Sequence, residues 1–394
     1  MAPTLSPASA LRLQASMIFT VMAASSVPSP LYAVYRAEWG FSPIVLTAVF
    51  AVYAFSLLAA LLTLGSLSDH LGRKPVVIGA LCVEAISIAM FLAADSVGLL
   101  IAARLVQGAA TGVAMSVLGA GVADLDRQRA PLVNSAAPLL GLGTGALISS
   151  LLATFAPAPL HLVYAVMLVL LSTQTCLATR LPETIAPRPG ALRSMLPMVA
   201  VPPSARRAFM SVVPLNVAVW ALAGFFLSLG STLAQDVTGR HGPLVGGSML
   251  AALAWTGGVA SLKWQRLGAA PLMRLACGSL AAGVALVLMA THTRSTTLFF
   301  LGIVVAGVGF GLGSVAVMRT VMSNALPEQR ASLMAALLTL SYFSMSLPAL
   351  AAGAAVSHLG LITTAQVYGA FVMVLALAAL TASLSQLKPA AAAR

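Results

Sequence analysis

Long uncharged apolar runs, separated by short charged segments, are the dominant pattern of this chain. The hydrocarbon core of a bilayer is about 30 Å thick and needs roughly 20 apolar helical residues, and unpaired charges are avoided inside it. The runs 130–179 and 331–387 are each long enough for two spans, and the run 75–94 is interrupted only by Glu84. The predicted spans are 14–35, 44–64, 75–94, 97–123, 132–155, 160–179, 209–233, 244–262, 271–291, 296–318, 332–355 and 361–385. The pattern therefore predicts an all-α membrane protein with twelve transmembrane helices.

Composition excludes several other classes of protein. Of the 394 residues, 60% are apolar and 8% are charged, and the mean hydropathy is +0.99. A water-soluble domain carries roughly 25% charged residues, so a soluble enzyme is excluded. The three cysteines are scattered through apolar runs and form no disulfide or metal framework. The net charge of +12 is spread between the spans rather than clustered on one face, so we expect no nucleic-acid partner.

The distribution of basic residues predicts the orientation of the spans. Lys and Arg stay on the cytoplasmic side of a membrane. With the N-terminus inside, the inner segments hold seventeen basic residues, including Lys388 and Arg394, and the outer segments hold only Arg36, Arg240 and Arg294. We therefore expect a multi-pass protein of the cell (inner or plasma) membrane with both termini in the cytoplasm. The alternative for the first span is a cleaved signal peptide, since Arg12 precedes an apolar run followed by small residues.

The chain is predicted to consist of two halves. Segment 181–208 contains six prolines and four basic residues, so it cannot form a span or one continuous helix. We interpret it as a cytoplasmic linker between an N-terminal six-helix bundle, residues 1–180, and a C-terminal six-helix bundle, residues 209–394. Short repeats agree, because Leu71-Gly72 and Leu267-Gly268 follow the second and the eighth span. Parallel repeats of this kind are typical of transporters that bind substrate between two halves.

The turn after the second span, here called the gate motif, is the strongest motif. It reads Gly65-Ser66-Leu67-Ser68-Asp69-His70-Leu71-Gly72-Arg73-Lys74-Pro75. Gly65 allows two helices to approach, Gly72 permits a turn that other residues resist, and Pro75 suits the first turn of a helix. Asp69 can pair with Arg73. The plain alternative is a tight basic turn that only sets the orientation of the spans.

The gate motif closely resembles the G-x-L-x-D-R-x-G-R-R/K signature of the major facilitator superfamily. Span number, repeats and linker extend the resemblance over the whole chain. It implies two pseudo-symmetric six-helix bundles, transport by alternating access, and a cytoplasmic gate formed by Gly65, Asp69, Gly72, Arg73 and Lys74. The motif departs from the family at His70, where the signature usually has Arg or Lys.

Arg104 and Gln107 in the fourth span form a second motif. Together with Thr111 they follow helical spacing, so one polar stripe runs along an apolar helix. An arginine inside a membrane must be paired or must reach water. The segment resembles the R-x-x-Q-G signature of the same superfamily, which is tied to proton translocation in proton-coupled members. The alternative is that Arg104 extends along the helix to the outer interface.

Glu84 is the only acidic residue well inside a predicted span. A carboxyl group in hydrocarbon needs a cationic partner or a bound proton, and both suit a proton carrier. We therefore place Glu84 with Arg104 and Gln107 in a central polar or proton site. A structural polar contact is the other interpretation, and the lack of a carboxylate in the first span weakens the assignment of proton antiport.

Small residues and helix breaks mark further candidate positions. Gly141 and Gly145 in the fifth span partly resemble an antiporter signature of the same superfamily, although close helix packing explains them nearly as well. Prolines in the first span remove backbone donors, as expected for a helix that lines a cavity. Possible cavity residues are Pro28, Pro30, Asn216, Trp220 and Tyr342, for which packing or an interfacial location is the alternative.

Other chemistry is missing from the sequence. It contains no phosphate-binding G-x-x-x-x-G-K-[ST] loop and no hydrolase or metalloprotease motif, so we expect neither an enzyme nor a cofactor or metal. It shows no repeated pore segment of a channel. We therefore predict a monomeric secondary transporter, a proton-coupled exporter or antiporter for efflux of small organic or drug-like molecules. The alternative is a facilitator that imports or equilibrates a small metabolite, such as a sugar or an organic acid, by symport or uniport.

Overall fold

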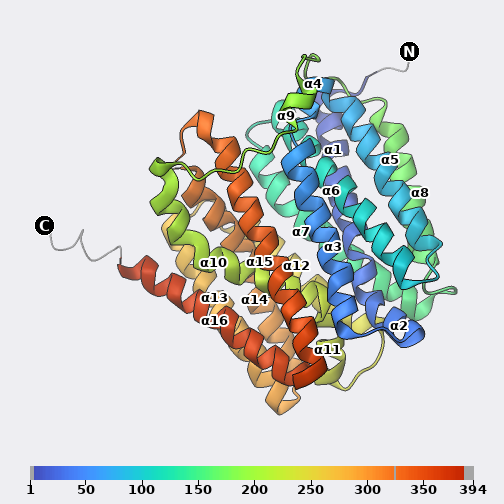
Figure 1. Cartoon of the computed structure of the whole chain (residues 1–394), viewed down its shortest axis with the longest axis vertical. Coiled ribbons are helices and arrows are strands. Elements are labelled where there is room, and N and C mark those ends of the chain that lie inside the picture. Colours follow the sequence, from blue (N-terminus) through green and yellow to red (C-terminus); the bar gives the residue numbers. More distant parts are fainter. Residues whose placement is uncertain (1–3, 324, 386–394) are drawn as a thin grey trace, which may run out of the picture. The chain divides into compact units, whose positions relative to one another are not determined.

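The computed structural model describes residues 4–323 and 325–385, and in these residues the only regular elements are helices (Figure 1). The first half contains α1 (Pro7–Ser26), α2 (Pro28–Trp39), α3 (Pro43–Leu64), α4 (Ser68–Leu71), α5 (Arg73–Leu92), α6 (Val97–Leu125), α7 (Ala130–Phe155) and α8 (Leu162–Ala178). The short helix α9 (Ala191–Ser194) lies in the segment between the halves. The second half contains α10 (Pro203–Ser228), α11 (Gly230–Thr238), α12 (Pro243–Lys263), α13 (Ala269–Thr293), α14 (Thr296–Met322), the short helix η1 (Pro327–Gln329), α15 (Arg330–Leu359) and α16 (Leu361–Ser385).

Each predicted span coincides with a helix or with a pair of consecutive helices. Among the described residues, eleven helical segments are long and apolar enough to cross a bilayer, and α8 is a shorter apolar helix of 17 residues. Several helices extend beyond the predicted spans: α1 begins at Pro7 rather than 14, and α10 begins at Pro203 rather than 209. Charged residues limit the part of a helix that lies in hydrocarbon, but they do not end the helix itself. The multi-span all-α prediction is therefore confirmed.

The two halves use the same signals to begin and end helices. Gly40 ends α2 and Gly239 ends α11, and both adopt the left-handed conformation that stops a helix. Ser96 begins α6 and Ser295 begins α14, and each hydroxyl accepts a hydrogen bond from the backbone amide three residues later. These pairs are related by the offset of about 200 residues that the sequence repeats indicate.

The described chain forms two compact units. Unit 1 comprises residues within 1–41, 48–197 and 242–248, and unit 2 comprises those within 42–47, 198–241 and 249–394. In unit 1, α1 packs against α6 and α7, and α5 packs against α6 and α8. In unit 2, α13 packs along α14 and α16, and α10 packs against α14, α15 and α16. The boundaries 1–180 and 209–394 proposed from the sequence remain a prediction.

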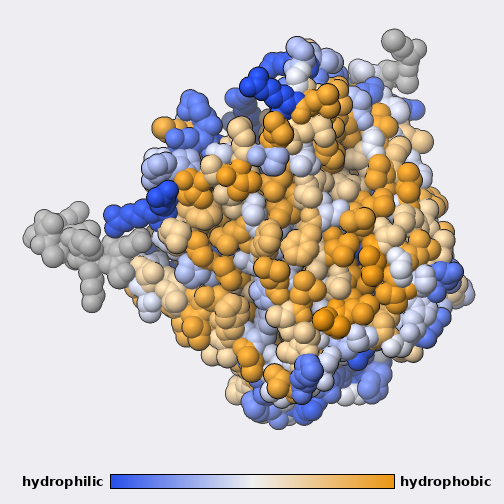
Figure 2. Space-filling model, in the orientation of Figure 1, coloured by the Kyte–Doolittle hydropathy of each residue, from blue (hydrophilic) through white to orange (hydrophobic). Residues whose placement is uncertain are grey.

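Apolar side chains cover much of the helix surface. On the face shown in Figure 2, hydrophobic residues cover the helices, and hydrophilic residues gather near the helix ends. Large exposed apolar side chains such as Ile86, Leu105 and Val169 would be costly in water and are ordinary against lipid. The predicted cytoplasmic location of the termini, with Lys388 and Arg394, concerns residues that lie outside the described part of the chain.

Candidate functional site

The gate motif forms the short helix α4 and the turn into α5. Gly72 has φ +97°, a conformation that residues with a side chain rarely adopt, and it connects α4 to the first residue of α5. Pro75 lies at the third position of α5, where a helix does not need its missing N–H. The Ser116 hydroxyl of α6 donates to the Gly65 carbonyl over 2.7 Å, which ties the start of the motif to α6.

Arg73 is the charged centre of the gate motif. Its guanidinium pairs with Asp69 over 2.5 Å and with Asp124 over 3.1 Å, and it donates to the Ser68 hydroxyl over 2.6 Å. The Arg73 side chain is 9% exposed, whereas Asp69 is 53% exposed. The predicted Asp69–Arg73 contact is therefore present, but the sequence analysis missed Asp124, which lies in the last turn of α6, 51 residues from Arg73. The Lys74 ammonium group forms no hydrogen bond or ion pair among the described residues.

Arg104 lies inside unit 1 with its guanidinium bonded to protein groups. It donates to the Tyr32 hydroxyl over 2.6 Å, to the Ser25 carbonyl over 2.8 Å and to the Gln107 side-chain oxygen over 2.7 Å. Only 1% of the residue is exposed, so the side chain does not reach the outer interface. One terminal nitrogen, Nη2, is buried without a hydrogen-bond partner in the part of the chain that the structure describes.

Glu84 joins this group through Gln107. The Gln107 side-chain nitrogen donates to Glu84 Oε1 over 3.3 Å, and the Thr111 hydroxyl donates to Glu84 Oε2 over 3.2 Å. All three residues are fully buried. Glu84 and Arg104 form no direct ion pair among the described residues, so Gln107 is the connection between acid and base. We call Glu84, Arg104, Gln107 and Thr111 the central network.

The central network also contacts the break between α1 and α2. Pro28 has no N–H, so the Ala24 carbonyl four residues earlier loses its usual helical donor. The Gln107 side-chain nitrogen donates to this carbonyl over 3.2 Å, and Arg104 donates to the neighbouring Ser25 carbonyl. The break therefore leaves carbonyls without a helical donor, and side chains of α6 donate hydrogen bonds to them. Both Pro28 and Pro30 are buried.

Aromatic rings enclose the Arg104 guanidinium. The rings of Tyr32, Tyr53 and Phe91 have their centroids 5.3, 5.2 and 5.5 Å from its central carbon. Cation–π contacts of this kind stabilise a charge that is removed from water. Sequence analysis did not identify these rings, because nothing in an apolar span distinguishes an aromatic residue that faces a distant arginine from one that faces lipid.

Gly141 and Gly145 pack α7 directly against the backbone of α1. A Cβ atom at either position would collide with the backbone carbonyl oxygen of Phe19 or of Ala23, respectively. One turn further along α7, the Ser149 hydroxyl donates to the Val27 carbonyl over 2.7 Å. These small residues therefore line the α1 segment that leads into the break.

The remaining predicted cavity residues, Asn216, Trp220 and Tyr342, are uncharged and lie close together in unit 2. Asn216 of α10 exchanges hydrogen bonds of 3.1 and 3.2 Å with Ser341 of α15, and both are buried. One turn away from Asn216 on α10, and beside Ser341 on α15, the rings of Trp220 and Tyr342 lie 5.3 Å apart. The predicted faces of α10 and α15 thus meet each other.

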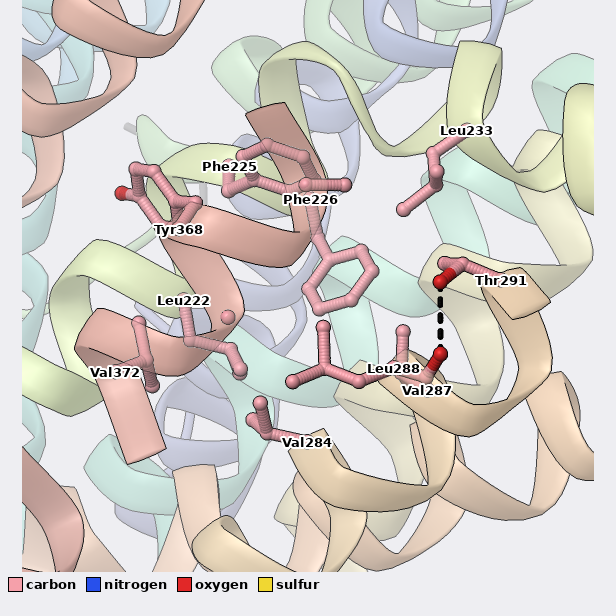
Figure 3. Close-up of a pocket in the computed structure, with 12 residues that line it drawn as sticks. Leu222, Phe225, Phe226, Leu233, Val284, Val287, Leu288, Thr291, Tyr368 and Val372 are labelled. Carbon is pink, nitrogen blue, oxygen red and sulfur yellow. Dashed lines mark hydrogen bonds between the residues drawn. The ribbon is translucent and has the colours of Figure 1, made fainter. Parts of the chain in front are cut away.

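A separate apolar pocket in unit 2 lies among α10, α11, α13 and α16 (Figure 3). Its two hydroxyl groups are already bonded to the backbone, Thr291 to the Leu288 carbonyl and Tyr368 to the Ala221 carbonyl. None of the residues predicted from the sequence lines it. A specific ligand site combines apolar walls with polar groups that orient the ligand, so this pocket is a poor candidate for substrate.

Long apolar helices in both units, with buried charged residues in unit 1, define the class of the protein, a multi-span membrane protein. The family model of the Major Facilitator Superfamily matches residues 15–349, and the chain belongs to this family. Its members are transporters and not enzymes, so the protein is a secondary transporter.

Solved structures share the fold at low sequence identity. The human organic anion transporter MFSD10 (TETRAN) is 18% identical with a TM-score of 0.67, and the match covers 95% of this chain and 100% of that chain. The nucleoside transporter NupG is 14% identical with a TM-score of 0.71 and coverage of 96% and 99%. A structure described for substrate recognition in proton dependent oligopeptide transporters is 13% identical with a TM-score of 0.75 and coverage of 97% and 98%. These transporters differ in substrate, so the likeness establishes the fold alone.

Proposed function

We propose that this protein is a proton-coupled exporter of small organic molecules, and that Glu84 carries the proton. The observation that carries the proposal is the central network. Glu84 is the only acidic residue that is buried among the described residues, and one glutamine connects it both to Arg104 and to the α1/α2 break. Among the described residues, Glu84 is therefore the one buried carboxyl group in unit 1 that can accept a proton.

Protonation of Glu84 changes its hydrogen bonding with Gln107 and Thr111. As a carboxylate, Glu84 accepts hydrogen bonds from Gln107 and Thr111. When one oxygen carries a proton, it becomes a donor, and one of these partners must turn to accept. Gln107 also holds the Ala24 carbonyl, so its reorientation alters the contact between α6 and the break. When Gln107 is the partner that turns, protonation of Glu84 is linked to the contact between α6 and the α1/α2 break.

Arg104 Nη2 supplies a donor for the substrate or for a water molecule that accompanies it. The nitrogen is buried and has no partner among the described residues. A buried donor without a partner costs about 1–3 kcal/mol, and a bound acceptor would recover that free energy. The pair Asn216–Ser341 and the rings of Trp220 and Tyr342 in unit 2 supply neutral polar and aromatic groups, which suit small organic compounds.

The gate motif would act as the cytoplasmic latch. Arg73 is held between Asp69 and Asp124, and the two contacts of 2.5 and 3.1 Å close the turn within unit 1. The large exposure of Asp69 leaves its carboxylate free to change partners during a transport cycle. The excess of Lys and Arg on the inner side of the predicted spans supports this placement, with both termini in the cytoplasm and the protein in the cell membrane. We propose that it acts as a monomer.

The test uses inverted membrane vesicles that are acidified inside and contain a pH-sensitive dye. Lipophilic cations, antibiotics, sugars and organic acids are added in turn. Proton release on addition of a compound, present in the wild type and absent in Glu84→Gln, supports proton antiport and identifies the substrate class. Asp95→Asn is the matched control, because it converts an exposed acid to its amide outside the network.

Two other outcomes distinguish the alternatives. If Glu84→Gln abolishes proton release but still exchanges labelled substrate across the membrane, Glu84 acts in coupling rather than in folding. If no compound moves protons, yet labelled sugars or acids equilibrate without a gradient, export by antiport is wrong and a uniporter for a small metabolite replaces it.

A further inference from the structure

Glu183, in the linker that follows α8, binds the first turn of α5. Its Oε1 accepts a hydrogen bond of 2.7 Å from the Arg73 backbone amide, and its Oε2 accepts one of 3.1 Å from the Lys74 amide. Oε1 also accepts bonds from the amides of Thr184 and Ile185, over 3.0 and 3.3 Å, which fix the carboxylate in the linker. Glu183 lies outside the gate motif and outside the central network.

These bonds satisfy the free donors at the start of α5. The first backbone amides of a helix have no partner inside the helix. In α5 these positions are Arg73, Lys74 and Pro75, and proline has no N–H. The residue before the helix is Gly72, which has no side chain to cap it. Glu183 therefore provides the cap from 110 residues away in the sequence.

The absence of a side chain at Gly72 leaves room for the Glu183 carboxylate. A Cβ atom at Gly72 would lie 2.6 Å from Glu183 Oε2, so any side chain there would push the carboxylate away from the two amides. The turn thus needs glycine for two reasons, its positive φ and the space that Glu183 occupies.

The neighbouring Thr184 binds Asp124, the acidic partner of Arg73. Its hydroxyl donates over 3.0 Å to Asp124 Oδ2, the same oxygen that accepts from the Arg73 guanidinium over 3.1 Å. Residues 183 and 184 thereby fix the backbone of Arg73 and the acid to which its side chain is bound.

Further along, the linker follows the gate motif. The Arg188 amide donates to the His70 carbonyl over 2.8 Å, and the His70 ring lies 3.2 Å from the Pro189 carbonyl oxygen. The Ser66 hydroxyl donates to the Ser194 carbonyl over 2.9 Å, and α9 lies beside α4 in Figure 1. The contact of Glu183 is one of several along this stretch.

We propose that Glu183 is a positioning residue of the gate. It holds the first turn of α5 so that the Arg73 guanidinium meets Asp69 and Asp124, and Thr184 completes the arrangement. This inference rests on the proposed latch role of the gate motif. The proposed role also accounts for the hydrogen bonds that residues 183–194 form with the gate motif and with Asp124.

The first test is hydrogen–deuterium exchange of the full-length protein in detergent, which needs no substrate. Loss of a helix cap corresponds to about a five-fold change in an equilibrium. We expect peptides covering 70–78 to exchange about that much faster in Glu183→Ala and to an intermediate extent in Glu183→Gln, which keeps one acceptor oxygen. Glu328→Gln, an exposed acid of unit 2, is the control. Unchanged exchange in Glu183→Ala would overturn the inference.

The second test separates positioning from substrate binding. With the compound that releases protons in the vesicle assay, Glu183→Ala should lower the maximal rate about five-fold and leave KM within about two-fold. Gly72→Ala should cost less in a Glu183→Ala background than in the wild type, whereas strictly additive effects contradict the proposed contact. If Arg73→Ala loses transport and Glu183→Ala does not, only this inference fails. If Arg73→Ala transports normally, the latch role itself is wrong.

Discussion

The turn between α4 and α5 in unit 1 and the turn between α12 and α13 in unit 2 place glycine and proline at matching positions but differ in charge and in backbone conformation, since φ is +97° at Gly72 and −64° at Gly268. Gly72 precedes α5 and Gly268 precedes α13, and a proline occupies the third position of both helices. In unit 1 the turn supplies Arg73, and the end of α6 supplies Asp124. In unit 2 the end of α14 supplies the cation, because Arg319 donates to the turn carbonyls of Leu267 and Gln265 over 2.7 and 2.5 Å.

The same contrast holds in the interior of the units. Arg73, Glu84 and Arg104 are the charged residues that are buried among the described ones, and all lie in unit 1. Seven of the nine acidic residues also lie in unit 1, and unit 2 has only Asp236 and Glu328. Carboxylates can take up a proton or exchange a cation, whereas backbone carbonyls cannot be titrated. Among the described residues, both units therefore share helix signals, but the buried charged groups lie only in unit 1.

The largest effect on this difference between the units is expected from Arg104→Ala, which removes a buried charge of unit 1. Removal of the guanidinium leaves the Tyr32 hydroxyl, the Ser25 carbonyl and the Gln107 side chain without their donor in a buried site. We expect transport to fall by about 100-fold or more and the free energy of unfolding to fall by about 3 kcal/mol. Vesicle transport and thermal melting in detergent measure the two effects. Normal transport by both Arg104→Ala and Arg104→Lys would show that the Arg104 guanidinium has no role in transport.

A direct comparison of the two turns comes from Arg73→Ala and Arg319→Ala. Arg73 is held by two carboxylates that we assign to the latch, so we expect its loss to slow transport by about 30-fold. Among the described residues, Arg319 of α14 bonds only to carbonyls of the turn between α12 and α13, so its loss should slow transport by about three-fold while lowering the melting temperature. Initial rates of proton release, normalised to protein amount, give the ratio. Equal losses for the two variants would contradict the functional difference between the turns.

Glycine substitutions test the part of the scaffold that the two units share. Gly145 packs against the Ala23 carbonyl in unit 1, and Gly224 of α10 packs against the Met345 carbonyl of α15 in unit 2. A Cβ would force each helix away from a backbone that cannot rotate aside, so Gly145→Ala and Gly224→Ala should each cost about 2 kcal/mol of stability. Thermal melting in detergent measures both. A large cost at only one of them would show that the packing differs between the units.

The smallest effect is expected at the neutral pair of unit 2. Asn216→Ala and Ser341→Ala each remove one partner of a buried hydrogen-bonded pair, and each should lower stability by about 1 kcal/mol without uncoupling proton release from substrate. The double variant should cost less than the sum of the single variants because both remove the same contact. Loss of proton coupling in these variants would assign coupling to unit 2 as well.

The sequence by itself determined the membrane class, the spans and the helices, because each depends on apolar length and on local start and stop residues such as Ser96 and Gly40. It also identified Arg73 with Asp69, and Arg104 with Gln107, since these pairs are three or four residues apart on one chain segment. Glu84 was found because an acid in a span is rare.

Only the tertiary structure decided which distant groups meet these residues. Asp124 and Glu183 lie 51 and 110 residues from Arg73, and Tyr32 lies 72 residues from Arg104. It also decided that Gln107, rather than a direct ion pair, connects Glu84 with Arg104. Hydropathy and helical periodicity fix which residues lie on one face of a helix, but the rotation of each helix against its neighbours depends on packing over the whole unit.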